Sequence, residues 1–354
     1  MLVYEEIFKP KKTEKFKPAK TEAVGPRLGK KKAVTPRHYA GDRRDGRVYV
    51  YDEDIVLAVN VALTTKRPLL IRGASGSGKS SLARNVARFF KWRYYEEVIS
   101  SRTQARDLQW GFDTLRRLSD AQAEGGVKRD EYYVEPGVLW WAFDRESALR
   151  RGVSKEDLRN VVKPEDMEKF RPSDPNKGDE HESAVVLIDE IDKADPDTPN
   201  NLLVALGSFE FYATEAKKQV KAAEPPLVII TSNDERELPS AFLRRCIMLN
   251  LPSPDRKRLV EIARAHFGSD DMTLYKEVAA LIIPEEKKTA KTSSTMPKPA
   301  PTPTEAKSQQ SAAEYLDTVH ACLELKITPK AKDKTWEALS KATLWKPREP
   351  TGAA

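Results

Sequence analysis

Apolar residues in this chain gather into short runs that alternate with amphipathic helical patterns. The run at residues 48–51 precedes three acids that can cap a helix, and apolar side chains then recur at helical spacing over residues 55–63. A second run, residues 68–71, predicts a short strand, and a glycine-rich turn and an amphipathic helix follow it. Strand, glycine loop and helix in this order open a doubly wound α/β domain, so the sequence predicts a parallel sheet with helices on both faces.

Four further segments are candidates for the remaining strands of this sheet, and the one at residues 184–188 is wholly apolar. They lie at residues 94–99, 184–188, 227–231 and 247–251. Near-continuous apolar strands are typical of a parallel sheet that is covered on both faces. About eighty residues separate the second strand from the third, which exceeds an ordinary crossover and predicts an insertion around residues 120–183. We expect its aromatic part to pack and its charged part, residues 154–182, to be exposed.

The pattern becomes helical after residue 252. A segment rich in lysine, threonine, proline and serine at residues 285–311 interrupts the helical part and predicts a flexible linker. The predicted domains are therefore a disordered basic tail, a sheet domain with the insertion, a small helical lid with the linker inside it, and a disordered end. They cover residues 1–35, 36–252, 253–346 and 347–354.

The composition excludes several classes of protein. With 39% hydrophobic and 32% charged residues, the chain is typical of a globular protein with some unfolded sequence. Because no stretch of eighteen or more apolar residues occurs, we expect no membrane span, and the lysine-rich start lacks the apolar core of a secretory signal. Cys246 and Cys322 have no metal-ligand spacing, so we expect a reduced, cytoplasmic protein.

The net charge of +7 is unevenly distributed. Residues 1–47 hold 14 lysines and arginines against 6 acids, so the rest of the chain carries a net charge of −1. The basic character therefore belongs to the tail and not to the folded body. Such a tail could touch nucleic-acid phosphates or an acidic partner, and an unbound, solvated tail is an equally good interpretation.

The glycine-rich turn carries the first candidate chemistry. Residues 73–80, Gly-Ala-Ser-Gly-Ser-Gly-Lys-Ser, fit the phosphate-loop pattern G-x-x-x-x-G-K-[ST] in full. Glycines let backbone N–H groups curl around phosphate oxygens, Lys79 can reach the β- and γ-phosphates of ATP, and the Ser80 hydroxyl can ligate Mg²⁺. A chance match in an ordinary glycine turn is the alternative, but the strand before it and the helix after it favour a phosphate loop. The candidate nucleotide-binding residues are Gly73, Ser75, Gly76, Ser77, Gly78, Lys79, Ser80 and Ser81.

Two acids follow the apolar strand at residues 184–188. At the carboxyl edge of a parallel sheet, such acids face the ligand crevice. Asp189 is the candidate ligand of Mg²⁺, and Glu190 is the candidate that orients and polarises the attacking water. An acidic helix cap after a core strand is the alternative, which weakens because the glycine loop lies about a hundred residues upstream in the same predicted sheet.

Polar residues at two further element ends are also candidates. Asn233 follows the strand at residues 227–231 and could hydrogen-bond the γ-phosphate or the lytic water, although Asn233 and Asp234 could equally form a simple turn. Arg244 and Arg245 follow at a helix end. Paired arginines are usually solvated, but a guanidinium presented to a neighbouring subunit's γ-phosphate is how an arginine finger works.

The order of phosphate loop, acid pair, asparagine and arginine pair resembles that of the AAA+ ATPases. Five segments look more narrowly like the MoxR branch of that class, at residues 102–108, 112–113, 188–194, 201–203 and 243–246. The resemblance covers residues 36–285 well and the lid less well. It implies an AAA+ P-loop domain, Mg²⁺-dependent ATP hydrolysis, and a homo-oligomeric ring of six copies.

The same resemblance implies roles for single residues. The implied catalytic residues are Glu190, Asn233, Arg244 and Arg245. Asn233 takes the sensor-1 position, and one of the two arginines is a finger supplied in trans. The lid departs from the family, which carries a basic sensor-2 residue before a lid helix, whereas this chain has Lys-Ser-Gln-Gln at residues 307–310. Lys307 or Gln309 could take that place.

Three classes of function follow from these features. MoxR-like proteins commonly serve partners with von Willebrand A domains, so the first class is an ATPase that remodels or activates a partner protein complex. The second is a scaffold that assembles on ATP and recruits an effector, and some similar proteins belong to bacterial defence systems. The third is a nucleic-acid motor that uses the basic N-terminal tail. ATP and Mg²⁺ are the expected cofactors.

Overall fold

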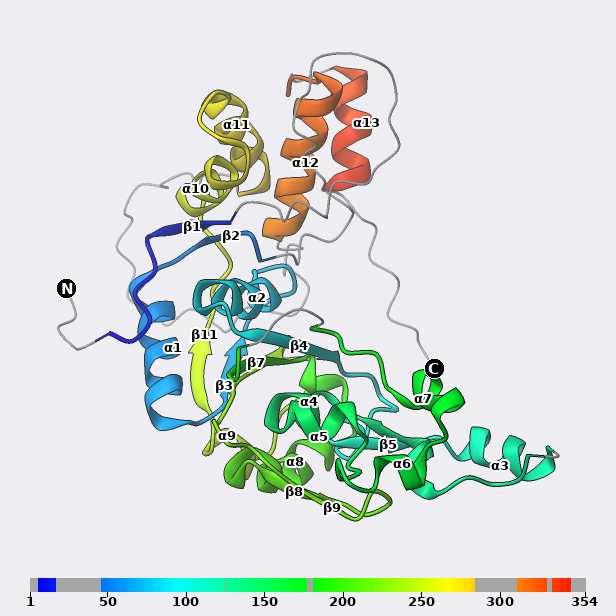
Figure 1. Ribbon diagram of the computed structural model, residues 1–354. Coiled ribbons are helices and arrows are strands. Elements are labelled where there is room, and N and C mark those ends of the chain that lie inside the picture. Colours follow the sequence, from blue (N-terminus) through cyan, green and yellow to red (C-terminus); the bar gives the residue numbers. More distant parts are fainter. Residues whose placement is uncertain are drawn as a thin grey trace, which may run out of the picture. The chain divides into compact units, whose positions relative to one another are not determined.

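The computed structural model describes most of the chain (Figure 1). The described residues are 6–16, 46–123, 125–176, 181–283, 311–329 and 333–344. The chain divides into a first compact unit, Met1–Gly73 with Lys79–Asn250, and a second compact unit, Ala74–Gly78 with Leu251–Ala354. All but the last residue of the predicted linker, and the predicted disordered end at residues 347–354, lie outside the described residues.

A five-stranded parallel sheet forms the centre of the first unit, with the strand order β11-β3-β10-β7-β4 (Figure 1). Its strands are β3 (Leu69–Arg72), β4 (Arg93–Val98), β7 (Ala184–Asp189), β10 (Leu227–Ser232) and β11 (Ile247–Asn250). Every residue of β7 and β10 is buried, as a sheet covered on both faces requires. Because the strands are parallel, their carboxyl ends meet at one edge of the sheet, the carboxyl edge, and their amino ends meet at the opposite amino edge. The predicted doubly wound α/β fold is confirmed.

Helices cover both faces of this sheet. α2 (Lys79–Phe90) lies on one face and α4 (Val138–Phe143) lies on the other (Figure 1). α1 (Glu53–Thr65) packs beside β3 and β11, and it begins where the acids predict, because the Asp52 carboxylate accepts a hydrogen bond from the Ile55 N–H (3.0 Å). The other elements after β7 are α8 (Thr198–Ser208), the antiparallel pair β8 (Glu210–Ala213) and β9 (Lys218–Lys221), and the short α9 (Ser240–Leu243).

The long connection between β4 and β7 has its own packing. It contains the antiparallel pair β5 (Trp110–Phe112) and β6 (Val134–Pro136) and the helices α3 (Thr114–Gln122), α5 (Arg145–Leu149), α6 (Leu158–Val161) and α7 (Met167–Phe170). The expected aromatic packing is present, since Tyr132, Tyr133 and Trp140 are all buried. The charged stretch at residues 154–182 is not uniformly exposed, because Phe170 is buried with its ring centroid 5.8 Å from that of Tyr132. Helices of four residues are too short to show a helical period in the sequence.

The prediction of a disordered tail over residues 1–35 is wrong for its first part. Phe8 is fully buried, with its ring 4.8 Å from that of Phe89 and 5.4 Å from that of Tyr51. The Asn60 side chain accepts the Phe8 N–H (2.7 Å) and donates to the Phe8 carbonyl (2.9 Å). β1 (Thr13–Lys15) then pairs antiparallel with β2 (Val48–Val50). A single aromatic anchor leaves the composition of the segment polar, so composition alone predicts disorder here.

The second unit contains four helices among its described residues. They are α10 (Arg256–Phe267), α11 (Met272–Ile282), α12 (Ala312–Leu325) and α13 (Lys334–Thr343). Tyr275, Tyr315 and Trp336 are buried between them, and the Tyr315 hydroxyl donates to the Tyr275 carbonyl (3.0 Å). The expected helical C-terminal region is therefore present. In the described part of the chain, none of the helices combines the length and apolar character that crossing a bilayer would require.

Candidate active site

The glycine loop joins β3 to α2 at the carboxyl edge of the sheet. Gly73, Gly76 and Gly78 have φ angles of 145°, 73° and 93°, which residues with a Cβ rarely adopt. The pattern therefore needs glycine at these positions for the backbone to turn and expose its N–H groups. Of the other predicted phosphate-binding residues, Ser75 and Ser77 lie in the loop, and Ser81 lies in the first turn of α2. Residues 74–78 group with the second unit, and the side-chain contacts described below lie within the first.

Lys79 is the buried cation of this edge. Its Nζ donates to the Gly73 carbonyl (2.7 Å) and to Asn233 Oδ1 (2.7 Å). Burial lowers the pKa of Lys79 below its ordinary value, and the nearby carboxylate of Asp189 opposes that shift. An ammonium that is held partly desolvated gains more from an arriving anion than a solvated one does. The position suits the binding of a polyphosphate.

Ser80, Asp189 and Thr231 form an oxygen cluster next to Lys79. The Ser80 hydroxyl lies 3.0 Å from both carboxylate oxygens of Asp189. The Thr231 hydroxyl, fully buried at the end of β10, donates to the same carboxylate. Hydroxyl and carboxylate oxygens are the ligands that Mg²⁺ prefers, and Mg²⁺ completes its shell with water and substrate phosphates. The cluster therefore fits Mg²⁺, although the described residues include no group of three or more His, Cys, Asp or Glu that could cage a metal ion.

Glu190 stands beside this cluster in a left-handed backbone conformation, with φ of 61°. Its N–H donates to the Thr231 hydroxyl (2.9 Å), so one threonine fixes both acids of the pair. Its carboxylate accepts from Lys193 Nζ at 2.8 Å and from Asn233 Nδ2 at 3.4 Å. Asn233 thus bridges Glu190 and Lys79, and the hydrogen bond to Glu190 raises the pKa of Lys193. The acid sits at the carboxyl edge within reach of the predicted phosphate site, already engaged by two side chains.

Three residues of this edge were missed as candidates: Thr231, Asp192 and Lys193. Asp192 is 3% exposed, and its Oδ2 accepts the N–H groups of Asn233 (3.1 Å) and Glu235 (2.9 Å), which fixes the turn after β10. Its Oδ1 has no hydrogen-bond partner within the described residues. A polar side chain at the end of an apolar strand was the available signal for Thr231, and an acid inside an apolar turn was the signal for Asp192.

The structure does not bring Arg244 and Arg245 to this edge. They follow α9 and precede β11, so they lie at the amino edge, on the far side of β3 from the glycine loop. β3 has four residues, which corresponds to about 13 Å of extended chain. Both arginines are exposed, and neither guanidinium has a hydrogen bond or ion pair with any residue that the structure describes.

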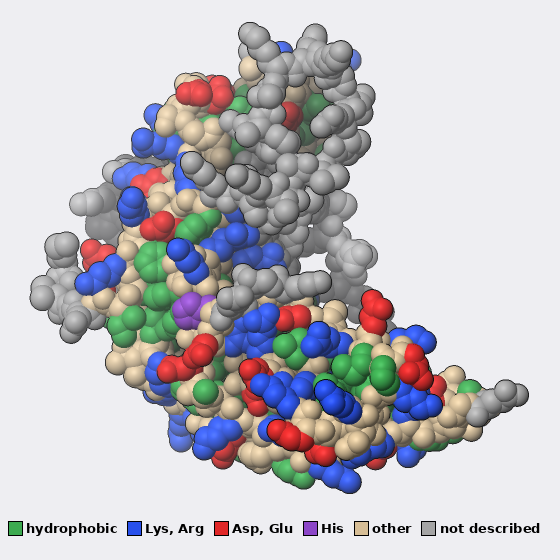
Figure 2. All heavy atoms as spheres, in the orientation of Figure 1, with side chains coloured by type: hydrophobic (Ala, Val, Ile, Leu, Met, Phe, Trp, Pro, Cys, Tyr) green, Lys and Arg blue, Asp and Glu red, His purple; other side chains and the backbone are tan. Residues whose placement is uncertain are grey.

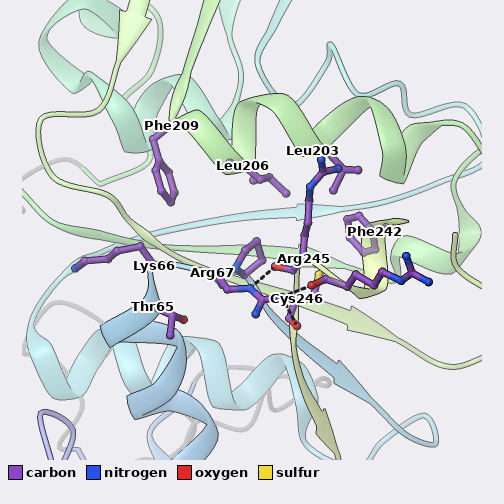
Figure 3. Close-up of a pocket in the computed structure, with 12 residues that line it drawn as sticks. Thr65, Lys66, Arg67, Leu203, Leu206, Phe209, Phe242, Arg245 and Cys246 are labelled. Carbon is purple, nitrogen blue, oxygen red and sulfur yellow. Dashed lines mark hydrogen bonds between the residues drawn. The ribbon is translucent and has the colours of Figure 1, made fainter. Parts of the chain in front are cut away.

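A pocket of about 460 Å³ lies at this amino edge, within the first unit (Figure 3). α8 supplies Leu203 and Leu206 on one side, and residues 65–68 line the opposite side. Arg244 and Arg245 belong to the same lining, which contains basic residues and no acidic residue. The two edges of the sheet therefore carry different parts of the predicted machinery.

Comparison with known proteins assigns a family. Residues 68–246 match the AAA domain family, dynein-related subfamily, over just over half of the chain. The chain belongs to this family of AAA nucleotide-binding domains. The matched region begins immediately before β3 and ends immediately before β11, so it contains the glycine loop, the acid pair, Asn233 and both arginines. Among curated proteins, no sequence matches this chain.

Two solved structures align with this chain at low sequence identity. A candidate ATPase from Cytophaga hutchinsonii aligns with 14% identity and a TM-score of 0.36, over 63% of this chain and 51% of that one. A single-substitution variant of RuvB from Thermotoga maritima aligns with 12% identity and a TM-score of 0.39, over 82% of this chain and 67% of that one. The present chain thus spans about half the length of the first of these proteins. The family assignment rests on the sequence match alone.

Proposed function

We propose that this chain is an Mg²⁺-dependent ATPase of the MoxR-like kind, which works as a ring of identical copies and remodels or activates a partner protein complex. The observation that carries this proposal is the convergence of Lys79, Ser80, Asp189, Glu190 and Asn233 at the carboxyl edge. These residue types supply positioning and charge neutralisation, which is most of what phosphoryl transfer asks of a protein. The ring of six copies follows from the likeness to MoxR proteins.

Each residue of the carboxyl edge has a proposed task. Lys79 binds the β- and γ-phosphates, while Ser80 and Asp189 hold Mg²⁺. When bound, Mg²⁺ neutralises charge that develops on the phosphate oxygens. Glu190 orients the attacking water. To do so, its carboxylate must lose its ion pair with the Lys193 ammonium and accept a hydrogen bond from that water. Asn233, which contacts both Lys79 and Glu190, aligns the water with the γ-phosphate.

The arginine pair supports a shared site. Arg244 and Arg245 lie at the amino edge, across the sheet from the proposed phosphate site of their own chain. An exposed guanidinium that has no partner among the described residues can serve the γ-phosphate of a neighbouring copy instead. One chain then completes the site of the next, and hydrolysis changes the contact between them. Assembly and turnover are coupled for this reason.

The partner is proposed from the MoxR likeness alone, as another chain with a von Willebrand A domain, acting with this protein in the cytoplasm. Nucleic acid is the weaker partner. On the face shown in Figure 2, lysine and arginine side chains are interspersed with aspartate and glutamate and form no continuous basic stripe. Residues 6–16 of the tail belong to the first unit, and Lys9, Lys11 and Lys15 are exposed there, so among the described tail residues these are the candidates for phosphate contacts.

An ATP-gated scaffold is the second candidate. The observation that favours it is the 2.8 Å ion pair between Lys193 and Glu190, which engages the proposed water-orienting carboxylate. If this pair persists with ATP bound, the chain would bind ATP and assemble but turn over slowly. An effector that displaces Lys193 would then release activity.

Steady-state ATP hydrolysis by wild type and Glu190→Gln tests these functions. The expected result is that Glu190→Gln keeps ATP binding and loses turnover by about a hundredfold or more. Glu237→Gln, an equal charge change at an exposed position in the loop between β10 and α9, should retain wild-type turnover. Wild-type turnover no faster than that of Glu190→Gln, with ATP-dependent assembly intact, would favour the scaffold. Affinity purification of Glu190→Gln with ATP should retain the partner that wild type releases.

A further inference from the structure

Arg67 makes an unusual set of contacts at the amino edge. It stands two residues before β3, and its guanidinium donates to three consecutive backbone carbonyls (Figure 3). Nε donates to the Arg245 carbonyl at 3.0 Å, and Nη2 lies 3.4 Å from the Cys246 carbonyl. Nη2 also donates to the Arg244 carbonyl. All three acceptors belong to the turn that carries the arginine pair.

This turn needs donors from outside. α9 has only four residues, and the N–H groups that follow it are used within the turn: Arg244 N–H donates to the Ser240 carbonyl (3.1 Å) and Arg245 N–H to the Phe242 carbonyl (3.0 Å). The carbonyls at a helix C-terminus have no intrahelical donor and attract positive charge. The planar fork of a guanidinium can supply several N–H groups to such carbonyls at once, which a lysine ammonium on a flexible stem does less well.

Arg67 itself starts from a fixed position. The adjacent Pro68 is buried, and its carbonyl accepts the Ile247 N–H (2.8 Å), which joins the start of β3 to the start of β11. The Arg67 side chain therefore reaches from the sheet to the turn before β11. The backbone of the arginine pair is held on both sides while the two guanidiniums stay without a partner among the described residues.

Lys66 provides a contrast in the same pocket. It is exposed and basic, it lines the pocket beside Arg67, and no hydrogen bond or ion pair involves its ammonium among the described residues. The charge of the pocket and the three-carbonyl contact can therefore be changed separately. A role that depended on charge alone would be shared by Lys66 and Arg67.

We propose that Arg67 is a positioning residue for the Arg244–Arg245 pair, holding the turn so that a guanidinium reaches the γ-phosphate bound to the neighbouring copy. The inference rests on the proposed function, in which one of these arginines acts in trans. In this proposal Arg67 does not itself contact the nucleotide. It acts through the backbone that it fixes.

The first test measures ATP turnover of Arg67→Ala, Arg67→Lys and the control Lys66→Ala, at a protein concentration where wild-type turnover per chain no longer rises. Arg67→Ala should lose turnover by about tenfold to a hundredfold, the effect of a small misplacement of a catalytic group, with ATP affinity unchanged. Lys66→Ala should stay within about twofold of wild type, since it removes a charge without a fixed contact. Equal turnover in Arg67→Ala and Lys66→Ala would overturn the proposal.

The second test asks in which chain the defect lies. Lys79→Ala chains should bind ATP at least about a hundredfold more weakly but still carry an intact arginine turn, so mixing them with Arg67→Ala chains should restore turnover at the Arg67→Ala sites. A loss that mixing does not restore would place the defect in the variant's own site or fold and would overturn the proposal. If Arg67→Ala does not fold, Arg67→Lys decides: a smaller loss, restored by mixing, supports the role, and wild-type turnover refutes it.

A parallel mixture separates this inference from the function on which it rests. Chains with both Arg244→Ala and Arg245→Ala, mixed with Lys79→Ala chains, should also regain turnover. If this mixture fails, the shared site itself is wrong and the inference falls with it. If it succeeds while the Arg67→Ala mixture fails, only the role of Arg67 is wrong.

Discussion

At the carboxyl edge of the sheet, Lys79, Ser80, Asp189, Glu190 and Asn233 hydrogen-bond to one another or through Thr231, with side-chain partners within the same unit. At the amino edge, about 13 Å away along β3, Arg244 and Arg245 have fixed backbones and exposed guanidiniums. The first arrangement satisfies its charges internally. In the second arrangement the backbone carbonyls accept hydrogen bonds from Arg67, whereas the guanidiniums of Arg244 and Arg245 are exposed.

The difference shows what each edge can do alone. Buried charges need partners in the same chain because desolvation is unfavourable, so the carboxyl edge must be a self-contained cluster. Exposed guanidiniums are hydrated and need no partner in their own chain, so those of the amino edge are available to bind an anion from another molecule. On the proposed function, binding of ATP belongs to one edge and its rapid hydrolysis requires both.

The largest expected effect on ATP binding is at the carboxyl edge. Lys79→Ala should weaken ATP binding by at least about a hundredfold, because two charge-assisted hydrogen bonds to phosphate are lost. Titration with a fluorescent ATP analogue measures the Kd. Lys66→Ala, which removes a lysine from the amino edge, should change the Kd by less than about twofold. Similar losses in both variants would show that general charge, and not the edge, governs binding.

The amino edge should affect turnover without affecting binding. Replacing the finger arginine with alanine, as Arg244→Ala or Arg245→Ala, should lower turnover by about a thousandfold while the Kd for ATP stays unchanged. The other single variant should lose less. Steady-state hydrolysis with a coupled assay distinguishes the two. Normal hydrolysis by both single variants would contradict the shared site and remove the functional contrast between the edges.

Within the carboxyl edge, Thr231→Val should have a moderate effect. Valine keeps the volume but leaves the Asp189 carboxylate and the Glu190 N–H without the hydroxyl that joins them. We expect a loss of about 1–3 kcal/mol in the free energy of unfolding and a fall in turnover. Thr231→Ser, which keeps the hydroxyl, should recover most of both. Urea denaturation of the two variants measures the first, and unchanged stability in Thr231→Val would show that the threonine does not organise the acid pair.

The smallest expected effect is a pH dependence of the ATP affinity that arises from Lys79. Because burial lowers its pKa below the ordinary value of 10.5, ATP affinity should fall as the pH rises through the lowered pKa. Over the same range the free protein should gain stability, since the unfavourable burial of the ammonium is relieved. Lys79→Arg keeps its charge throughout and should show no such fall in affinity. A wild-type Kd that is constant up to the titration range of exposed lysines would contradict the shift.

Much of the central architecture could be predicted from the sequence. The strand-like segments of the sequence predict all five sheet strands, and the structure places each strand bound within one residue of its prediction. Strand order follows no such pattern, because β11-β3-β10-β7-β4 is decided by which strand edges pair in three dimensions. The candidate residues of the carboxyl edge could be named because each follows a strand end, and parallel strands bring their carboxyl ends together. Their catalytic roles stay predictions.

By itself, the sequence determined the class of fold and the family. Glycines at fixed spacing in the loop, and strands whose two faces are both apolar, are local patterns that can be recognised along the chain. Only the tertiary structure decided that Phe8 is buried, that Thr231 joins the two acids, and that Arg67 holds the arginine turn. Each of these contacts joins residues that are more than forty positions apart in the chain. Such contacts depend on how the elements pack, and packing leaves no periodic trace along the chain.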